Sequence, residues 1–274
     1  MLSRVADRIG RHVGRLSGED KARLVGRLDR ASRVALKLLR YCPVSMATLA
    51  RISGTDKARG HDYIPTYERL LAPYRNRPIT LLELGVGGHE MLAAGRSLNL
   101  WEAYFRRATI VGVDVLDQRH LTRGRVHVYQ CSQTDAGALK EIAERFGGFD
   151  VVIDDGSHVN EHQIESFKIL FPLMKPTGVY VVEDTQTSFW PSYGGGSPGG
   201  SAFDRSALRF FMDLVPGLNH AERLPGDGGA PTPYERGIRS IHFEHNLIAV
   251  VLGDNTAPSN ADLASEAETL RIPR

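Results

Sequence analysis

Four acidic residues stand in two adjacent pairs in the second half of the chain. The segment DVVIDDGSHVNEHQ (150–163) places Asp154 and Asp155 after an apolar run, and the segment GVYVVEDTQ places Glu183 and Asp184 after another. If these runs are neighbouring strands, the carboxylates meet at one sheet edge, and their burial is costly unless a cation neutralises them. Oxygen ligands without cysteine suit a hard cation such as Mg²⁺. The alternative is that the acids cap helices or bond loop N–H groups. Two such pairs at successive strand ends favour the metal site.

The same segment contains a second pattern, because His158-Val-Asn-Glu161-His162 matches the HxxEH signature of one class of zinc peptidases. That interpretation needs both histidines on one exposed helical face and a further acidic ligand downstream. His158 instead falls at the very start of an expected helix, three residues after Asp155. There it is suited to act as a general base beside the metal. Spacing alone does not separate this role from that of a histidine bonded to solvent, and a zinc hydrolase remains the alternative function.

A glycine-rich turn, LLELGVGGHE, follows an earlier apolar run. Gly85, Gly87 and Gly88 allow a tight turn and let backbone N–H groups approach a ligand closely. A dinucleotide fingerprint needs Gly or Ala three residues after its second glycine, and that position holds Glu90. The pattern therefore favours the ExGxG turn of S-adenosylmethionine enzymes, in which Glu83 and the glycines cradle the methionine part. An NAD-dependent oxidoreductase is the alternative.

The next apolar run, IVGVDV, ends with Asp114. A carboxylate at this position can accept both hydroxyl hydrogens of a ribose diol. The alternative is an ordinary strand terminus at the surface. In order along the chain, the glycine turn and Asp114 together predict a nucleoside cofactor.

The elements that must position these residues alternate between strand-like and helical patterns. The alternation predicts βαβ units, and hence an α/β fold with a mostly parallel, doubly wound, Rossmann-like sheet and helices on both faces. A segment at 239–255, RSIHFEHNLIAVVLGDN, predicts an antiparallel hairpin that closes the sheet edge. The strand-like runs are Ile79–Leu84, Thr109–Val113, Val126–Tyr129, Val151–Ile153 and Val179–Val182, and the helical stretches are Met91–Phe105, Ala136–Phe146 and Glu161–Leu173.

One segment between these parts, SFWPSYGGGSPGGSAF (188–203), is too rich in Gly, Ser and Pro to predict regular structure. We expect a surface loop beside the functional edge of the sheet. Loops in this position often act as lids, and the aromatic residues at Trp190 and Tyr193 could close over a substrate. Plain disorder is the alternative.

The N-terminal region differs from the rest in charge and pattern. We expect a helical region over 1–53 and the cofactor domain over 54–274. Residues 1–40 carry eleven Lys and Arg against four Asp and Glu, or +7, so the other residues sum to −5 within the net charge of +2. An apolar stripe at Val5, Ile9, Val13 and Leu16 predicts a packing or oligomerisation helix, and hence a homo-oligomer, rather than a nucleic-acid or membrane binder.

Composition restricts the location of the chain. No apolar run reaches the length of a membrane span, and the N-terminus lacks the apolar core of a secretion signal. Two cysteines, Cys42 and Cys131, build no disulfide framework. We expect a cytoplasmic protein.

The chain resembles a known family in its most specific motifs. The segment from Glu83 to Gly88, followed by DVVIDDGSH and VVEDTQTSFWP, is similar to the metal-dependent sugar O-methyltransferases, which are class I S-adenosylmethionine-dependent enzymes. Mycobacterial enzymes that methylate mannose polysaccharides look like relatives. The likeness runs from GTDK (54–57) to the HFEHN segment of the hairpin.

The resemblance implies two cofactors, S-adenosyl-L-methionine and Mg²⁺, and a set of site residues. His158 is implied as the base that takes the sugar hydroxyl proton. The GTDK segment, with His61 and Tyr63, is implied near cofactor and substrate. The implied metal ligands are Asp155, Glu183 and Asp184, and the implied cofactor-binding residues are Tyr63, Glu83, Gly85, Gly87, Asp114, Gln133 (beside the adenine) and Asp154.

The implied reaction agrees with the chemistry of the residues. A sugar hydroxyl is a very weak acid, so a bound metal stabilises the developing alkoxide while His158 accepts the proton. The oxygen then attacks the S-methyl carbon in line. The expected partner is a rhamnose- or mannose-type acceptor on a glycosylated antibiotic, a glycolipid or a polysaccharide, with no nucleic acid and no membrane insertion.

Overall fold

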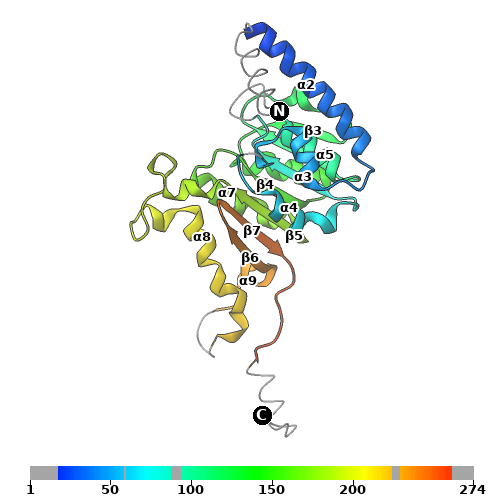
Figure 1. The fold of residues 1–274 in the computed structure, drawn as a ribbon. Helices are drawn as coiled ribbons and strands as arrows, with labels where there is room; N and C mark the ends of the chain where they lie inside the picture. The colour runs from blue at the N-terminus through cyan, green and yellow to red at the C-terminus, as the bar shows by residue number, and fades with distance from the viewer. Residues whose placement is uncertain (1–17, 59, 88–93, 224–228, 261–274) are drawn as a thin grey trace, which may run out of the picture. The chain divides into compact units, whose positions relative to one another are not determined.

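The computed structural model describes residues 18–58, 60–87, 94–223 and 229–260 (Figure 1). By their internal contacts the described residues form two compact units. The first comprises those of Met1–Arg77 and Val86–Ala108, and the second those of Pro78–Gly85 and Thr109–Arg274. The expected domain boundary between residues 53 and 54 stays a prediction.

The first unit is helical. The 3-10 helix η1 (Asp56–Ala58) lies between α3 and α4, and η2 (Ala72–Tyr74) follows α4. Tyr67 and Trp101 are buried in its core, with their ring centroids 5.2 Å apart in an edge-on contact. The apolar stripe expected between residues 5 and 16 lies outside the described residues. The α-helices are α2 (Gly18–Leu39), α3 (Met46–Ser53), α4 (Ile64–Leu71) and α5 (Arg96–Tyr104).

The second unit contains a seven-stranded sheet in the order β3-β2-β1-β4-β5-β7-β6. The first five of these strands are parallel to one another, and β7 is antiparallel to both β5 and β6. The predicted mostly parallel sheet with a closing antiparallel hairpin is therefore confirmed. The strands are β1 (Thr80–Leu84), β2 (Thr109–Asp114), β3 (Val126–Gln130), β4 (Phe149–Asp154), β5 (Met174–Glu183), β6 (Ile238–Glu244) and β7 (Leu247–Leu252).

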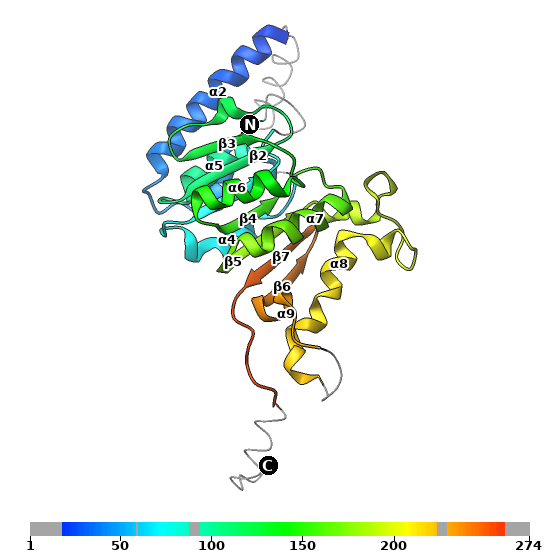
Figure 2. The same cartoon turned by 180° about the vertical axis from the view of Figure 1, so that it is seen from behind.

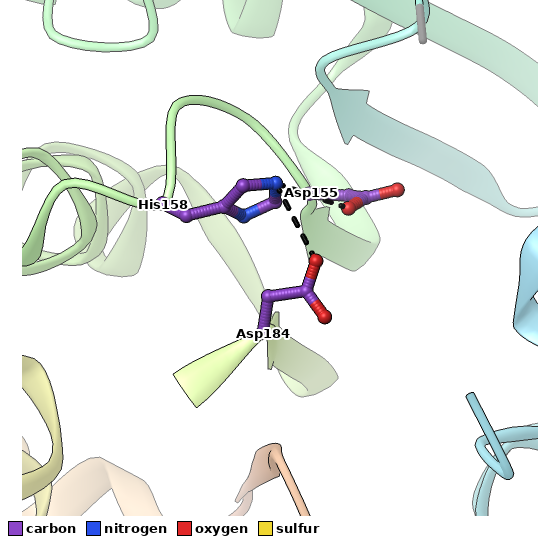
Figure 3. A group of neighbouring side chains, drawn as sticks. All are labelled: Asp155, His158 and Asp184. Atoms are coloured by element: carbon purple, nitrogen blue, oxygen red, sulfur yellow. Dashed lines mark ion pairs between the residues drawn. The ribbon is translucent and has the colours of Figure 1, made fainter. Parts of the chain in front are cut away.

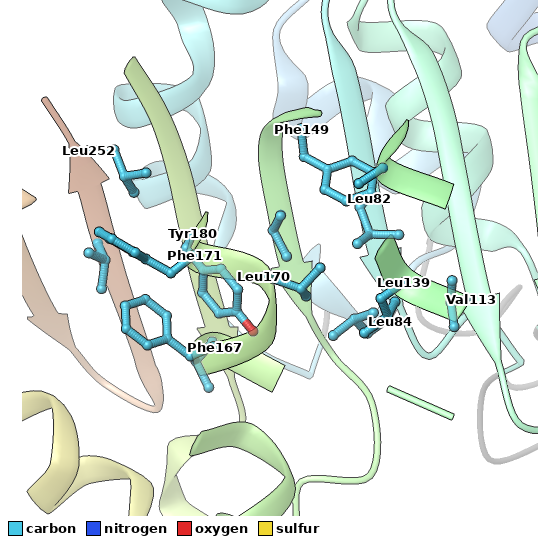
Figure 4. Packing of buried hydrophobic residues seen from close by; sticks show 14 of the residues in the cluster. Leu82, Leu84, Val113, Leu139, Phe149, Phe167, Leu170, Phe171, Tyr180 and Leu252 are labelled. Carbon is cyan, nitrogen blue, oxygen red and sulfur yellow. The ribbon is translucent and has the colours of Figure 1, made fainter. Parts of the chain in front are cut away.

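One face of this sheet packs against α6 (Ala136–Phe146), α7 (Asn160–Leu170) and α8 (Ala207–Asp213), as Figures 2 and 4 show. Phe167 of α7 is fully buried and meets the ring of Tyr180 from β5 edge-on, with 5.1 Å between centroids. Central parallel strands are buried on both faces, which is why they appear in the sequence as continuous apolar runs. The packed face fixes the positions of the strand ends that carry the acidic pairs.

The observed elements differ from the predicted ones mainly at their ends. The helix predicted over Glu161–Leu173 becomes α7 and the 3-10 turn η5 (Phe171–Leu173), because Pro172 lacks the N–H that a continuing helix needs. Strand β5 starts five residues earlier than predicted, at Met174, and its pairing with β4 contains a register shift. Helix α5 begins at Arg96, after Gly95 with φ 73°.

The segment predicted as an irregular loop, 188–203, is more regular than its composition indicated. It contains the end of the 3-10 helix η6 (Thr185–Phe189), η7 (Pro191–Tyr193) and the start of η8 (Phe203–Arg205). The 3-10 helix η9 (Val215–Glu222) and the short helix α9 (Pro233–Gly237) lead into the hairpin. In the part of the chain that the structure describes, no helix combines the length and the apolar character of a membrane span.

Candidate metal and cofactor site

Three side chains converge where β4 and β5 end (Figure 3). The Nε2 atom of His158 lies 3.9 Å from Oδ1 of Asp155 and 3.5 Å from Oδ2 of Asp184. One ligating atom from each residue lies within 4.8 Å of the other two, and no other group of this kind occurs among the described residues. Because β4 and β5 are parallel neighbours, their following turns leave the same edge of the sheet. The sequence predicted this meeting of acids from two strand ends.

Two of these residues hold a strained backbone. His158 has φ 58° and Asp184 has φ 55°, and Asn246 is the one other non-glycine residue with positive φ in the described ranges. A left-handed conformation costs a non-glycine residue on the order of 1 kcal/mol or more, so the surrounding contacts must enforce it. The backbone carbonyl of Asp184 is held by the N–H of Thr187 at 3.2 Å, and the next residue, Thr185, donates to the carbonyl of Asn246 at 3.1 Å. Backbone strain at two residues of the same cluster indicates a functional constraint.

The electrostatics of the cluster favour a cation. The side chains of Asp155, His158 and Asp184 are only 21%, 12% and 16% exposed, so two carboxylates repel each other in a partly dehydrated space. A protonated His158 relieves this repulsion by pairing with both. The buried Nδ1 atom of His158 has no hydrogen-bond partner in the described part of the chain, so its ring meets charged groups at Nε2. The cluster can accept either a proton on the imidazole or a metal ion between the acids.

Glu183, predicted as a third acidic ligand, takes a different position. It is 2% exposed at the end of β5, and its backbone carbonyl accepts a hydrogen bond of 3.0 Å from Nε2 of Gln163. Its carboxylate does not belong to the group of three. Its role as a metal ligand stays a prediction.

The first aspartate of the DDGS turn points into the protein, opposite to its neighbour. Asp154 is fully buried, and its carboxylate accepts hydrogen bonds from Gln133 Nε2 at 3.1 Å, Tyr180 Oη at 3.2 Å and the Gly156 N–H at 3.4 Å. Burial raises the pKa of Asp154 to about 7, because a dry environment penalises the charged form more than these hydrogen bonds favour it. Tyr180, beside it and also buried, has its pKa raised as well.

Gln133 connects this buried carboxylate to the turn above it. Its Nε2 also donates to Oγ of Ser166 at 2.9 Å, and its Oε1 accepts the Ser157 N–H at 2.7 Å. A Cβ on Gly156 would lie 2.3 Å from that Oε1, so a side chain here would displace the Gln133 amide. Gln133 thus holds the DDGS turn that carries Asp155. Its predicted place beside the adenine, and that of Asp154 against the cofactor, stay predictions.

The glycine turn after β1 lies directly against the same turn. Gly85 has φ 80° and donates its N–H to the Val113 carbonyl at 2.8 Å. A Cβ on Gly85 would stand 2.1 Å from the carbonyl oxygen of Asp155. Glu83, two residues earlier in β1, is fully buried. The predicted cofactor turn and the predicted metal turn are therefore neighbours.

The remaining predicted cofactor residues are divided between the two units. Asp114 ends β2, and its Oδ1 accepts the Leu116 N–H at 2.8 Å. Tyr63 belongs to the first unit, where its ring stacks on that of His61 with 4.9 Å between centroids. Gly87 belongs to that unit too, while Gly88 and Glu90 lie outside the described residues.

The zinc interpretation of HVNEH is not supported. His158 precedes α7 rather than lying on it, and its imidazole faces the two aspartates. His162 lies within α7, with its Nδ1 at 2.9 Å from Oγ of Ser157. The sequence matches the HxxEH pattern. His158, however, has a left-handed backbone and lies before α7, so the two histidines do not share the helix on which both ligands would have to lie.

Sequence reasoning missed two buried amides in α7. Asn160 and Gln163 are 2% and 0% exposed. Asn160 bonds to a backbone carbonyl of the segment that follows β5, and Gln163 bonds to the carbonyl of Glu183, the last residue of β5. Together with Ser166, also fully buried, they occupy one helical face at a spacing of three residues. That periodic row of polar residues was the available signal, because a polar stripe on a helix between apolar strands has to bond to something internal.

Known proteins place these features in context. No family model matches the chain. It is 41% identical over 227 residues to the 8-demethyl-8-alpha-L-rhamnosyl tetracenomycin-C 2'-O-methyltransferase of Streptomyces olivaceus, covering 81% of this chain and 58% of the relative. It is 40% identical over 197 residues to the mycinamicin VI 2''-O-methyltransferase of Micromonospora griseorubida, covering 71% and 49%. The chain belongs to the sugar O-methyltransferase family. The predicted resemblance is confirmed.

A solved structure agrees with this relationship. The MycE methyltransferase of mycinamycin biosynthesis, in complex with Mg, SAH and mycinamycin VI, superposes with a TM-score of 0.72 and 36% identity. The match covers 78% of this chain and 55% of that one. The class I methyltransferase fold, Rossmann-like, is thereby confirmed. The chain spans between 49% and 58% of the length of the curated relatives that it matches.

Proposed function

We propose that this chain is an S-adenosylmethionine- and Mg²⁺-dependent O-methyltransferase that acts on a sugar hydroxyl of a glycosylated natural product. The observation that carries the proposal is the cluster of Asp155, His158 and Asp184 beside the Gly85 turn, in a homologue of sugar O-methyltransferases. The relatives' names give rhamnosyl tetracenomycin-C, mycinamicin VI and olivosyl-oleandolide as acceptors, which supports a sugar carried on an aglycone.

The donor set fits a magnesium ion. Asp155 and Asp184 offer carboxylate oxygens in a space small enough for one ion, and Glu183 at the end of β5 is the third acid that we assign to it. Oxygen ligands of this kind favour a hard cation over zinc. When bound, the ion lowers the pKa of a coordinated sugar hydroxyl and stabilises its developing negative charge.

His158 is the proposed base. Its side chain is 12% exposed, and its Nε2 faces Asp155 and Asp184, the two aspartates of the proposed metal site (Figure 3). A neutral imidazole takes the hydroxyl proton on Nε2, and the two carboxylates stabilise the imidazolium that forms. The left-handed backbone at His158 keeps the ring in this orientation.

The cofactor is proposed to lie across the ends of β1 and β2. Glu83, Gly85 and Gly87 hold its methionine part, and Asp114 accepts the hydrogens of the ribose diol. Gln133 flanks the adenine. We further assign Asp154 and Tyr63 to the cofactor side of the site. The close packing of Gly85 against the Asp155 carbonyl supports this placement of the cofactor, since it keeps the cofactor turn next to the metal turn.

The finer identity of the acceptor belongs to the same proposal. A rhamnose- or mannose-type sugar is expected, on an antibiotic in preference to a glycolipid or polysaccharide. A homo-oligomer, a cytoplasmic location and a methyltransferase domain over 54–274 complete the proposal.

Transfer of a labelled methyl group tests it. The purified protein is given labelled S-adenosylmethionine with rhamnosyl and mannosyl acceptors, among them the rhamnosyl tetracenomycin of the S. olivaceus relative. We expect transfer to a rhamnoside that stops in excess EDTA and returns with Mg²⁺. Undiminished transfer in EDTA would remove the metal from the proposal, and absence of transfer to every sugar would remove the acceptor class.

A further inference from the structure

The segment that follows Asp184 has a defined, hydrogen-bonded backbone rather than that of an open loop. The Gly195 N–H donates to the Trp190 carbonyl at 3.0 Å, and the Gly196 N–H donates to the Ser188 carbonyl at 3.0 Å. A Cβ on Gly195 would stand 2.4 Å from the carbonyl oxygens of both Thr187 and Ser188. Gly195 therefore serves close packing of the backbone.

A single buried side chain fixes this segment to the helix after His158. The Nδ2 group of Asn160 donates to the carbonyls of Thr187 at 3.0 Å and Tyr193 at 2.9 Å. Its Oδ1 accepts from Oγ of Ser188 at 3.0 Å and from the Ala207 N–H at 2.8 Å. All four hydrogen-bonding positions of the amide are thus used, and Asn160 is 2% exposed.

The outer side of the segment is aromatic and faces water. Phe189 and Trp190 are 45% and 47% exposed. Phe189 rests on Phe203, with 5.6 Å between centroids, and Trp190 lies 5.9 Å from the ring of Tyr193. Large aromatic side chains held in fixed positions at a surface next to a reactive cluster are characteristic of binding sites, because their burial by a ligand is favourable and costs little side-chain entropy.

We propose that residues 185–193 form an acceptor platform, a fixed surface on which Phe189 and Trp190 hold the apolar aglycone of the acceptor. Asn160 is its positioning residue. This proposal rests on the proposed function. The platform takes the place of the lid that the glycine-rich composition led us to expect. In this proposal, the part of the acceptor that does not react contacts residues of the second unit.

The position of the platform along the chain favours the aglycone over the reacting sugar. Thr187 bonds to the Asp184 carbonyl through both its N–H, at 3.2 Å, and its hydroxyl, at 3.0 Å, so the platform begins at the cluster. A 3-10 segment rises about 2 Å per residue, so Trp190 lies on the order of 10 Å farther on. The hydroxyl that reacts has to lie at Asp184, and the group that carries the sugar extends along the platform.

The positioning role of Asn160 is tested against a matched asparagine elsewhere in the same unit. Asn255 also bridges two carbonyls with Nδ2, those of Leu218 at 3.1 Å and Glu235 at 2.9 Å. Asn160→Asp and Asn255→Asp each remove two amide donors, and both should lower the melting temperature. The fluorescence of Trp190 separates them, since the only other tryptophan, Trp101, is fully buried.

We expect acrylamide to quench Trp190 at least about twofold more efficiently in Asn160→Asp, with lower fluorescence anisotropy, because the freed segment moves. Acrylamide should quench Trp190 in Asn255→Asp as efficiently as it does in the wild type. Equal quenching in the two variants would overturn the positioning role of Asn160.

The aglycone contact is tested with two acceptors that differ in the group on the sugar. Trp190→Ala should raise KM for the rhamnosyl tetracenomycin at least about tenfold with little change in kcat. This result is expected when the lost contact stabilises the bound acceptor and the transition state equally. KM for methyl rhamnoside, which lacks the aglycone, should not change. An equal rise in KM for both acceptors, or no rise for either, would overturn the platform.

The outcomes also separate this proposal from the function on which it rests. Normal methyl transfer with an unchanged KM in Trp190→Ala removes the platform alone. If no acceptor is methylated, the proposed function fails, and shielding of Trp190 from acrylamide by the rhamnosyl tetracenomycin still decides whether the platform binds it. Absence of shielding then overturns the platform too.

Discussion

Two adjacent aspartates of the DDGS turn belong to two different regions of the site. Asp154 lies in an inner network with Gln133 and Tyr180, where hydrogen bonds satisfy it and burial raises its pKa to about 7. Asp155 lies in an outer cluster with His158 and Asp184, where two acids crowd one imidazole. The inner region is satisfied by hydrogen bonds within the protein, and the outer one is the proposed metal site.

The difference follows from the geometry of a strand. Successive side chains point to opposite sides, so a pair of acids at a strand end sends one inward and one outward. The inner region then fixes the backbone of the turn, and the outer region uses that fixed turn. A substitution in the outer cluster should therefore alter chemistry with little loss of stability, while a substitution in the inner network should alter stability first.

The largest effect is expected for Asp155→Asn. This variant should lose at least about three orders of magnitude in turnover, because the proposed metal site would lose one ligand for the ion that would stabilise the developing charge on the sugar oxygen. In EDTA its melting temperature should equal or exceed that of the wild type, since one of two repelling charges is gone. Added Mg²⁺ should raise the melting temperature of the wild type and not of the variant. A magnesium-stabilised Asp155→Asn protein would contradict the outer cluster as metal site.

His158→Asn should lower kcat by roughly two to four orders of magnitude through loss of the base. Asparagine is the sharper substitution because it tolerates the left-handed backbone that His158 adopts, with φ 58°. His158→Ala adds backbone strain, so it should unfold at lower urea concentration than His158→Asn while having a similar kcat. Methyl transfer at wild-type rate in His158→Asn would remove the histidine from the proton transfer.

The inner region should show itself in the pH dependence of stability. The pKa of Asp154 is about 7 in the folded chain, against an ordinary value of 3.8, so between these values the folded state binds more protons than the unfolded state. The contribution of Asp154 to stability is then greatest at low pH and falls as pH rises from about 4 to 7. The total loss is a few kcal/mol at most, because each pH unit within this range removes at most about 1.4 kcal/mol.

Asp154→Asn removes that titration and should flatten this part of the curve. Urea unfolding in EDTA at a series of pH values measures it. A slope unaltered in Asp154→Asn would mean that another group titrates.

The smallest effect is expected where the two regions meet the cofactor turn. Gly85→Ala and Gly124→Ala both place a side chain at positive φ, 80° and 49°, which costs each about 1 kcal/mol. Only at Gly85 would the new Cβ meet backbone, at 2.1 Å from the Asp155 carbonyl, whereas nothing lies within 4 Å at Gly124. Gly85→Ala should therefore be less stable than Gly124→Ala by about 1–3 kcal/mol in urea unfolding. Equal losses would mean that the turn yields easily.

Much of the fold could be predicted because it depends on local pattern. The apolar runs of β1 and β4, the alternation with helices and the antiparallel hairpin each follow from periodicity and turn residues. The two acidic pairs could be placed at one edge because parallel strands end on the same side. The rest needed contacts between distant residues: the bonding of Asn160 to the carbonyls of Thr187 and Tyr193 leaves no mark in the local pattern beyond the row of polar residues in α7.

The sequence by itself determined the order of strands and helices, the strand ends that carry acids and the positions where glycine is needed, because backbone period and steric limits act between near neighbours. Only the tertiary structure decided which aspartate turns inward, and that His158 lies outside the helix and faces Asp155 and Asp184. It also decided that Asn160 holds the glycine-rich segment in place by hydrogen bonds. Those outcomes depend on burial and on hydrogen-bond partners tens of residues away, where one side chain can satisfy several backbone groups at once.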